Sequence, residues 1–513
     1  MLARTRSLGL AGIDAFQVDV EVRMSPRGLP TFSMVGLPDS AVKESRQRVQ
    51  SAIASLGIVL PTRKTTVNLA PAGRRKEGPG FDLPIAVCIL SAAGLLPPET
   101  VGEYFFTGEL ALDGSIRPVR GVLPMADHTA AIGHSGLVVP SANGREAVLA
   151  GDQKVYPAGH LSEVVDLLQG CGNLRPGTEA DGFTHGGGSA SGLDLSDVRG
   201  QEQAKRALEV AAAGGHNILM IGPPGSGKTM LARRLPSILP PMVREEAIET
   251  TKLHSVCGFL SEGQALVLER PFRAPHHTIS DAGLIGGGTA PRPGEVSLAD
   301  NGVLFLDELP EFRRNVLEVL RQPLEDGFVT IARASMSVTY PARFMLVAAM
   351  NPCPCGYLTD PRRSCCCTAP DIQGYMHRIS GPLLDRIDIH LEVAPVSWSD
   401  LSRAGPSGET SPEVRSRVVR ARERQVARFE GFEGVYSNAG MTGPMLRELC
   451  PLDEPSGALL RTAMDRFGFS ARAFDRVVKV SRTIADLDGA VSVGVRHVSE
   501  AIQYRALDRD YWT

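Results

Sequence analysis

The first part of the chain alternates between two hydrophobic periods. Apolar side chains recur at every second position over 16–22, which predicts a half-buried strand, and at helical spacing over 42–56. Further strands are expected at 65–69 and 104–112. This part is therefore predicted to form an α/β or α+β domain.

The middle of the chain contains short, fully apolar runs. Residues 218–221, 303–306 and 344–349 have the length and composition of strands that are buried on both faces. Such strands are typical of a parallel sheet flanked by helices, and helical periodicity takes over at 446–507. The predicted fold class is α/β, with a parallel sheet followed by a small helical domain.

Length and composition set the expected domain boundaries. A chain of 513 residues is too long for one hydrophobic core. Residues 175–192 are rich in Gly and Ser, which is typical of a flexible linker. We expect an N-terminal domain over 1–172, a linker over 173–193, a sheet domain with insertions over 194–400 and a helical domain over 401–513.

A phosphate-binding loop follows the apolar run at 218–221. It matches the Gly-x4-Gly-Lys-Thr pattern in the strand-to-helix context that the pattern requires. Its glycines let backbone N–H groups point at a phosphate chain, the lysine neutralises the β- and γ-phosphates, and the threonine is a ligand for Mg²⁺. The expected ATP-binding residues are Gly222, Pro223, Pro224, Gly225, Ser226, Gly227, Lys228 and Thr229.

Two further strands end in polar side chains that suit hydrolysis. Asp307 and Glu308 follow the run at 303–306, where Asp307 is expected to reach Mg²⁺ and Glu308 to polarise the attacking water. Asn351 follows the run at 344–349 and is expected to hydrogen-bond that water or the γ-phosphate. The alternative for Asn351 is a turn residue before Pro352.

Five of the nine cysteines fall between Cys353 and Cys367. A local cluster of this kind differs from the disulfide framework of a secreted protein. Cys353, Cys355, Cys365 and Cys367 are candidate ligands for one Zn²⁺, with Cys366 left over. The alternative is a group of reduced, buried thiols.

The net charge of −3 gives no global argument for binding nucleic acid, so DNA contacts would have to come from a local patch. The candidate DNA contacts are Arg270, Arg273, His276 and His277, with Arg333 and Arg343 on a later predicted hairpin. The alternative role for this candidate patch is to brace an insertion against the core.

No apolar run is long enough to span a membrane, and a cytoplasmic location without a membrane partner is expected.

Several motifs together carry a resemblance over almost the whole chain. They are the phosphate loop, Arg270-Pro-Phe-Arg-Ala-Pro-His-His, Leu306-Asp-Glu-Leu-Pro-Glu, Ala348-Ala-Met-Asn-Pro-Cys-Pro-Cys-Gly and Ser380-Gly-Pro-Leu-Leu-Asp-Arg. In this order they resemble the YifB/ComM family, magnesium-chelatase-like AAA+ ATPases with an N-terminal Lon-like domain of the ribosomal S5 type. The resemblance implies an AAA+ motor over 194–400 and a helical lid over 401–513.

The resemblance also implies roles for two arginines. Arg386 would be the arginine finger that reaches the γ-phosphate bound by a neighbouring subunit, and Arg472 would be the sensor 2 arginine, with Arg476 as the second choice for that role. Family members are taken to form hexameric rings, and ComM is regarded as a DNA helicase that promotes branch migration during natural transformation. A homo-hexamer acting on DNA is therefore expected.

Two other functions compete with this interpretation. One is a chelatase motor for metal insertion into a tetrapyrrole, which would not need the long N-terminal domain. The other is an ATP-dependent protease. Gly80 stands where the Lon family carries its nucleophilic Ser, and its partner Lys has no counterpart near Leu123 and Pro124, so we expect no acyl transfer.

Overall fold

The structure, a computed structural model, folds into two compact units. The first comprises Met1–Gly186 and Arg244–Leu268, and the second comprises Gly187–Val243 and Glu269–Thr513. The predicted linker over 173–193 lies for the most part outside the described residues. The described residues are 1–25, 29–133, 136–151, 153–177, 192–261, 264–288, 291–333, 336–396, 408–432 and 434–505.

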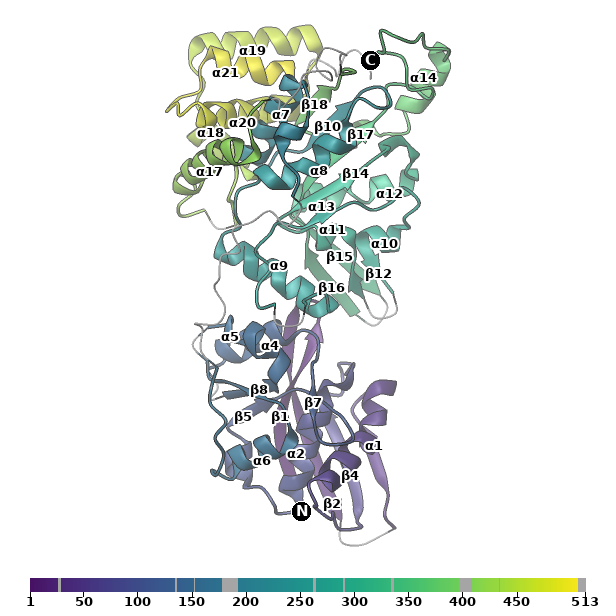
Figure 1. The fold of residues 1–513 in the computed structure, drawn as a ribbon, viewed down its shortest axis with the longest axis vertical. Helices are drawn as coiled ribbons and strands as arrows, with labels where there is room; N and C mark the ends of the chain where they lie inside the picture. The colour runs from purple at the N-terminus through teal and green to yellow at the C-terminus, as the bar shows by residue number, and fades with distance from the viewer. Residues whose placement is uncertain are drawn as a thin grey trace. The chain divides into compact units, whose positions relative to one another are not determined.

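The first unit is built on a seven-stranded mixed sheet (Figure 1). In spatial order its strands are β3 (Phe32–Val35), β4 (Lys64–Ala70), β2 (Asp14–Ser25), β1 (Leu2–Ala11), β5 (Tyr104–Phe106), β8 (Gly136–Pro140) and β9 (Val155–Ala158). β2 is antiparallel to both β1 and β4, and the other pairs are parallel. Alternate side chains of β2, from Phe16 to Val22, are buried, as the period of two predicts.

Helices and one small ribbon complete this unit. α2 is buried on every side, because all of its residues from Asp82 to Ala92 lie inside the core. The helices are α1 (Ser40–Ser55), α2 (Asp82–Ala92), α3 (Pro98–Val101), α4 (Val122–Ala131), α5 (Gly144–Val148), α6 (Leu161–Leu168) and α9 (Arg244–Cys257), and the ribbon is β6 (Glu109–Leu110) with β7 (Ile116–Arg117).

Helix α9 comes from the middle of the chain yet belongs to the first unit. Ser255 donates to the buried carboxylate of Glu146 at 2.7 Å, and Lys252 pairs with Asp127 at 2.8 Å. Burial raises the pKa of Glu146, because a charged carboxylate is poorly solvated inside the core. The hydrogen bond from Ser255 acts in the opposite direction, since it stabilises the charged form. Residues 244–268 fall within the range 194–400 that was expected to form a sheet domain with insertions, and in the structure they belong to the first unit.

The second unit contains a five-stranded, fully parallel sheet flanked by helices. In spatial order the strands are β11 (Phe272–Arg273), β14 (Val303–Leu306), β17 (Met345–Met350), β10 (Ile218–Ile221) and β18 (Ile389–Glu392). Every residue of β10, β14 and β17 is buried, which explains their uninterrupted apolar sequences. The predicted α/β class with a parallel sheet is confirmed.

Helices and short ribbons surround and interrupt this sheet. They are α7 (Glu202–Gly214), α8 (Lys228–Ile238), α10 (Asp281–Ile285), α11 (Glu295–Leu298), α12 (Arg314–Glu318), α13 (Arg321–Asp326), α14 (Ala369–Met376) and α15 (Gly381–Leu384), with the ribbon of β12 (Gly286–Gly287) and β13 (Arg292–Pro293) and the hairpin of β15 (Phe328–Arg333) and β16 (Met336–Pro341). Among the described helices, none is long and apolar enough to cross a membrane.

The C-terminal helices share one hydrophobic core with the sheet. This core runs from Ile218 and Val303 in the sheet to Leu460 and Val477 in the helices. Because the two domains share this core, the burial of apolar side chains holds the helical domain against the sheet domain. The helices are α17 (Ser411–Arg428), α18 (Gly443–Leu449), α19 (Glu454–Phe467), α20 (Ala471–Leu487) and α21 (Val495–Gln503).

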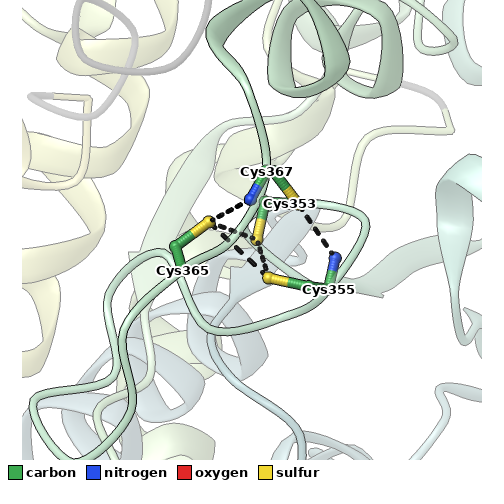
Figure 2. A group of neighbouring side chains, drawn as sticks. All are labelled: Cys353, Cys355, Cys365 and Cys367. Atoms are coloured by element: carbon green, nitrogen blue, oxygen red, sulfur yellow. Dashed lines mark hydrogen bonds between the residues drawn. The ribbon is translucent and has the colours of Figure 1, made fainter.

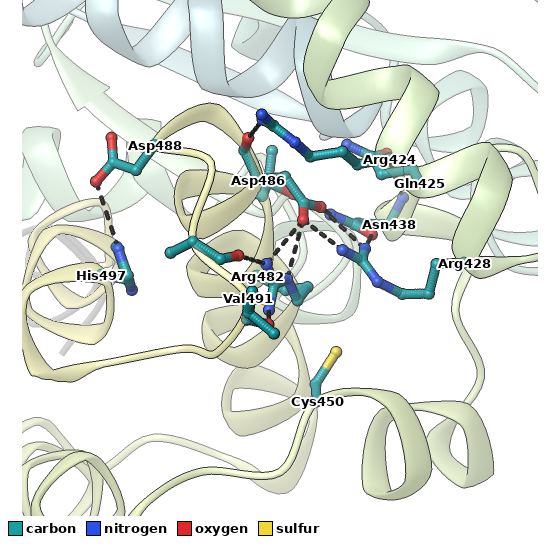
Figure 3. Close-up of polar contacts among 12 residues, drawn as sticks. Arg424, Gln425, Arg428, Asn438, Cys450, Arg482, Asp486, Asp488, Val491 and His497 are labelled. Atoms are coloured by element: carbon teal, nitrogen blue, oxygen red, sulfur yellow. Dashed lines mark hydrogen bonds and ion pairs between the residues drawn. The ribbon is translucent and has the colours of Figure 1, made fainter.

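A buried carboxylate organises the polar interior of this helical domain. Asp486 on α20 is fully buried and accepts hydrogen bonds from Arg428, Arg482 and Asn438, as Figure 3 shows. Arg417, which lies on α17 with Arg428, pairs with Glu209 of α7. Arg428 therefore holds α17 to α20, and Arg417 holds α17 to α7.

Candidate functional site

Three parallel strands bring the predicted nucleotide residues to one edge of the sheet. β17 lies between β10 and β14, in parallel register with both. The chain leaves β10 at Gly222, β14 at Asp307 and β17 at Asn351. Because parallel strands present their carboxyl ends at the same edge, residues far apart in sequence meet there, where open α/β sheets bind ligands.

The phosphate loop has the backbone conformation that its glycines allow. Gly225 and Gly227 have φ values of +77° and +95°, in the left-handed region that other residues avoid. A Cβ on Gly222 would lie 2.3 Å from the carbonyl oxygen of Val393, so this position has no room for a side chain. Helix α8 begins at Lys228, and its N-terminal N–H groups therefore follow the loop directly.

Lys228 is held at the centre of this edge. Its ammonium donates to the carbonyl oxygens of Gly222 and Pro223 at 2.7 and 3.0 Å, and to Oδ1 of Asn351 at 3.3 Å. The side chain is buried, and this burial lowers its pKa to about 8, against the opposing attraction of Asp307 and Glu308. The three acceptors thus hold the amine where a phosphate chain would displace them.

ATP affinity should consequently depend on pH on the alkaline side. Above about pH 8 the free protein carries Lys228 as the neutral amine, and binding then requires proton uptake. We expect ATP affinity to fall as pH rises, approaching about tenfold per pH unit. Titrations with a fluorescent ATP analogue from neutral pH to about pH 10 measure this. A Lys228→Arg control keeps its charge and should flatten the profile, whereas a flat wild-type profile would contradict the prediction.

Thr229 and Asp307 form the part of the site that suits Mg²⁺. The Thr229 hydroxyl donates to Oδ2 of Asp307 at 2.7 Å. The other carboxylate oxygen, Oδ1, accepts from the backbone N–H of Glu308 at 3.0 Å, which fixes the carboxylate plane. Besides phosphate oxygens, Mg²⁺ takes hydroxyl and carboxylate oxygens as ligands. Thr229 and Asp307 bring both kinds of oxygen together, so these residues fit the ion.

Glu308 projects from the same edge in a constrained conformation. It has φ +53° and ψ +48°, the left-handed region that is uncommon for a residue with a side chain. Its side chain is more than half exposed, at 58%, and therefore accessible to a substrate and water. Backbone outliers of this kind cluster at functional sites, where they aim a side chain.

His277 lies beside Glu308, which the sequence did not predict. Its Nδ1 is 3.6 Å from Oε2 of Glu308, and its ring packs 4.1 Å from the ring of His276. His276 in turn contacts the hydroxyl of Thr278 at 2.9 Å within its own turn. The two histidines were predicted DNA contacts, but His277 is a neighbour of the Glu308 carboxylate. Only the tertiary fold brings His277 and Glu308 together, and no local sequence signal indicates this contact.

The two arginines of the same predicted patch make structural contacts. Arg273 donates through Nε and Nη2 to both carboxylate oxygens of Glu295, at 2.6 and 2.7 Å. Arg270 donates to the carbonyl oxygens of Pro240 and Asn301 at 2.8 and 2.6 Å. These contacts favour the alternative in which both arginines brace the insertion.

Arg386 and Arg472 both lie beside the carboxylate of Glu325, a residue that was not predicted from the sequence. Arg386 is buried and donates to the carbonyl oxygen of Pro382 at 2.6 Å and to the carboxylate of Glu325. Arg472 is more exposed and lies 3.6 Å from the same carboxylate. The hydrogen bond from Arg386 holds the pKa of Glu325 below its usual range. The second choice for sensor 2, Arg476, is instead paired with buried Asp388.

The four candidate zinc ligands come together next to this edge. Cys353, Cys355, Cys365 and Cys367 place their sulfur atoms within 4.8 Å of one another. Cys353 lies two residues after Asn351, so the group adjoins the end of β17.

Family models match three successive parts of the chain. Residues 194–401 match "Magnesium chelatase, subunit ChlI", residues 20–143 match "Subunit ChlI of Mg-chelatase", and residues 408–505 match "Magnesium chelatase, subunit ChlI C-terminal". A magnesium-chelatase 38 kDa subunit of Cereibacter sphaeroides is 27% identical over 31% of this chain and 52% of its own length.

Other relatives match the chain from end to end. The competence protein ComM of Haemophilus influenzae is 45% identical over 99% of this chain and 98% of its own length. The protein YifB of Escherichia coli is 44% identical over 97% and 96% respectively. Likeness at this level over the full length confirms the resemblance read from the motifs. The chain thus belongs to the YifB/ComM family of magnesium-chelatase-like AAA+ ATPases.

Proposed function

We propose that this protein is an ATP-hydrolysing motor that assembles into a homo-hexameric ring and moves DNA, as a branch-migration helicase of the ComM type. The observation that carries the proposal is the convergence of Lys228, Thr229, Asp307, Glu308 and Asn351 at one sheet edge. The full-length likeness to a competence protein supports DNA as the substrate.

Each residue at the edge has a separate task in the proposed reaction. Lys228 would neutralise the β- and γ-phosphates, and Thr229 and Asp307 would hold Mg²⁺, which would offset charge on the phosphate oxygens. Glu308 is exposed and orients and polarises the attacking water. Asn351 already contacts the Lys228 ammonium and would hydrogen-bond the γ-phosphate or that water.

Assembly would complete the site through Arg386 and Arg472. Both share Glu325 as a counter-ion, so both belong to one face of the protomer. In a ring, the phosphate of a neighbouring subunit's ATP would replace Glu325 as the partner of Arg386. An arginine supplied in this way makes hydrolysis depend on assembly, because the permanently charged guanidinium matches phosphate geometry.

For DNA, we propose a surface formed by the β12–β13 ribbon and the β15–β16 hairpin, here called the ribbon platform. The two ribbons pack together, since Tyr340 donates to the carbonyl oxygen of Pro291 at 2.8 Å and the guanidinium of Arg333 lies over Gly287. Arg292 and Arg333 are exposed on it. Neither has an ion-pair partner among the residues that the structure describes, so both charges are available to phosphates.

Replacing both platform arginines, Arg292→Ala with Arg333→Ala, should weaken DNA binding without sequence preference. Loss of two phosphate contacts should lower the slope of log affinity against log salt by about two, while basal ATPase activity is kept. Fluorescence anisotropy of labelled fork DNA across a salt series measures this. The control replaces Arg420 and Arg461, two exposed arginines of the helical domain. Equal effects of both pairs would remove the platform as the DNA site.

The motor itself is tested by ATPase assays with no DNA and with single-stranded, duplex and branched DNA. We expect DNA to stimulate ATP turnover. Branched DNA should stimulate it most strongly, because the proposed motor moves the branch point. Hydrolysis without any response to DNA would retain the ATPase and reject the DNA substrate. Against the chelatase alternative, the chelatase subunit of Cereibacter sphaeroides matches 31% of the chain, whereas the competence protein ComM matches 99%.

A further inference from the structure

The cysteine cluster has the geometry of a structural metal site, drawn in Figure 2. The sulfur of Cys353 lies 3.4 Å from that of Cys355 and 3.7 Å from that of Cys365, and Cys355 and Cys365 are 3.6 Å apart. Four thiolates around one Zn²⁺, each about 2.3 Å from the ion, are separated from one another by about 3.8 Å. These three sulfur atoms therefore have the spacing of a tetrahedral zinc–sulfur site, and the fourth, of Cys367, lies within 4.8 Å of each of them. A disulfide would need sulfur atoms about 2.05 Å apart.

The backbone around the cluster is arranged as thiolate ligands require. The N–H of Cys355 points at the sulfur of Cys367, and the N–H of Cys367 points at the sulfur of Cys365, each at 3.4 Å. Such donors offset part of the negative charge that four thiolates bring to a site. The fifth cysteine of this segment, Cys366, is exposed and is not part of the group.

The cluster closes a loop that touches the nucleotide site. Cys353 and Cys355 lie in the segment that begins where β17 ends, and Cys365 and Cys367 lie just before the N-cap Thr368 of α14. Between them, Gly356 has φ +86° and lies so close to the phosphate loop that a Cβ would be 2.7 Å from Pro224. The same Cβ would be 3.8 Å from the side chain of Asn351.

We propose that Cys353, Cys355, Cys365 and Cys367 bind one Zn²⁺ and that this ion holds the loop at Gly356 against the phosphate loop and Asn351. Zinc suits the position because it prefers four thiolates, undergoes no redox change and leaves a closed structural site. The ion has no part in hydrolysis. It keeps Asn351 and Pro224 in place, so that Lys228 finds its acceptor before nucleotide arrives.

Metal analysis of the full chain, purified without added zinc or a metal-affinity step, tests the site. We expect about one equivalent of zinc per chain, retained in the Cys366→Ser control and reduced to below about a tenth in Cys365→Ser. Less than about a tenth of an equivalent in the wild-type protein, or iron in place of zinc, would overturn the proposal. The wild-type measurement needs no variant, so a Cys365→Ser protein that fails to fold leaves the test intact.

The positioning effect is measured separately and rests on the proposed function. Chelation of the zinc from wild-type protein should weaken binding of a fluorescent ATP analogue several-fold, and zinc alone, added back, should restore it. Unchanged affinity after complete zinc release would leave the metal site standing and refute its role at Asn351. Absence of nucleotide binding by the zinc-loaded protein would instead reject the proposed motor function.

Discussion

Glu308→Gln is expected to bind ATP with near wild-type affinity and to hydrolyse it slowly. The amide keeps the size of the side chain but cannot accept a proton from the attacking water, and loss of a general base costs about 10²- to 10⁴-fold in turnover. The exposed carboxylate and its constrained backbone support this role. Turnover rate and nucleotide affinity, measured on the same preparation, separate the loss of catalysis from a loss of binding.

Two matched variants give this result its meaning. Glu311→Gln changes a second exposed carboxylate three residues away, paired with Arg378 at 3.1 Å, and should leave turnover close to wild type. Lys228→Ala should lose ATP binding itself, because the phosphates then lack their central charge. If Glu308→Gln hydrolyses ATP at the wild-type rate, Glu308 is not the catalytic base.

Arg386→Ala should bind ATP and hydrolyse it about 10³-fold more slowly, as expected for an arginine finger. Buried Arg386 has its guanidinium on Glu325 and Pro382 within its own chain. We infer that its catalytic partner is a phosphate on another subunit, which would take it from Glu325. Steady-state turnover and nucleotide affinity of the purified variant test the first part of this prediction.

A mixing experiment tests whether the arginine acts in trans. Arg386→Ala and Lys228→Ala should each hydrolyse ATP poorly when alone, but a mixed ring contains interfaces with an intact Lys228 site facing an intact Arg386. Turnover should therefore reappear on mixing and peak at intermediate ratios. Arg386→Lys, which keeps a charge but loses the planar fork, should recover only part of the rate. The absence of rescue at every ratio would exclude a finger supplied by a neighbour.

Local sequence determined the nucleotide edge because each of its parts is a short motif at the end of a buried strand. The apolar run before Gly222 specifies a strand in a parallel sheet, and the glycines after it specify the loop. Once two more such strands end in Asp307 and Asn351, parallel pairing leaves their side chains at the same edge. The contacts of Thr229 with Asp307 and of Lys228 with Asn351 follow from this arrangement.

The partners of charged side chains were decided by the tertiary structure. A basic motif has the same sequence whether its arginines face DNA or a carboxylate, and only folding brings Glu295 to Arg273, Glu308 to His277 and Glu325 to Arg386. Helix α9 is a similar case, since it lies within the range expected for the sheet domain but belongs to the N-terminal unit, where Ser255 donates to Glu146. Hydrophobic period is a property of neighbours along the chain, so the sequence by itself determined strands, loop and helices. Charge pairing is a property of neighbours in space, and it was settled only when distant segments were packed together.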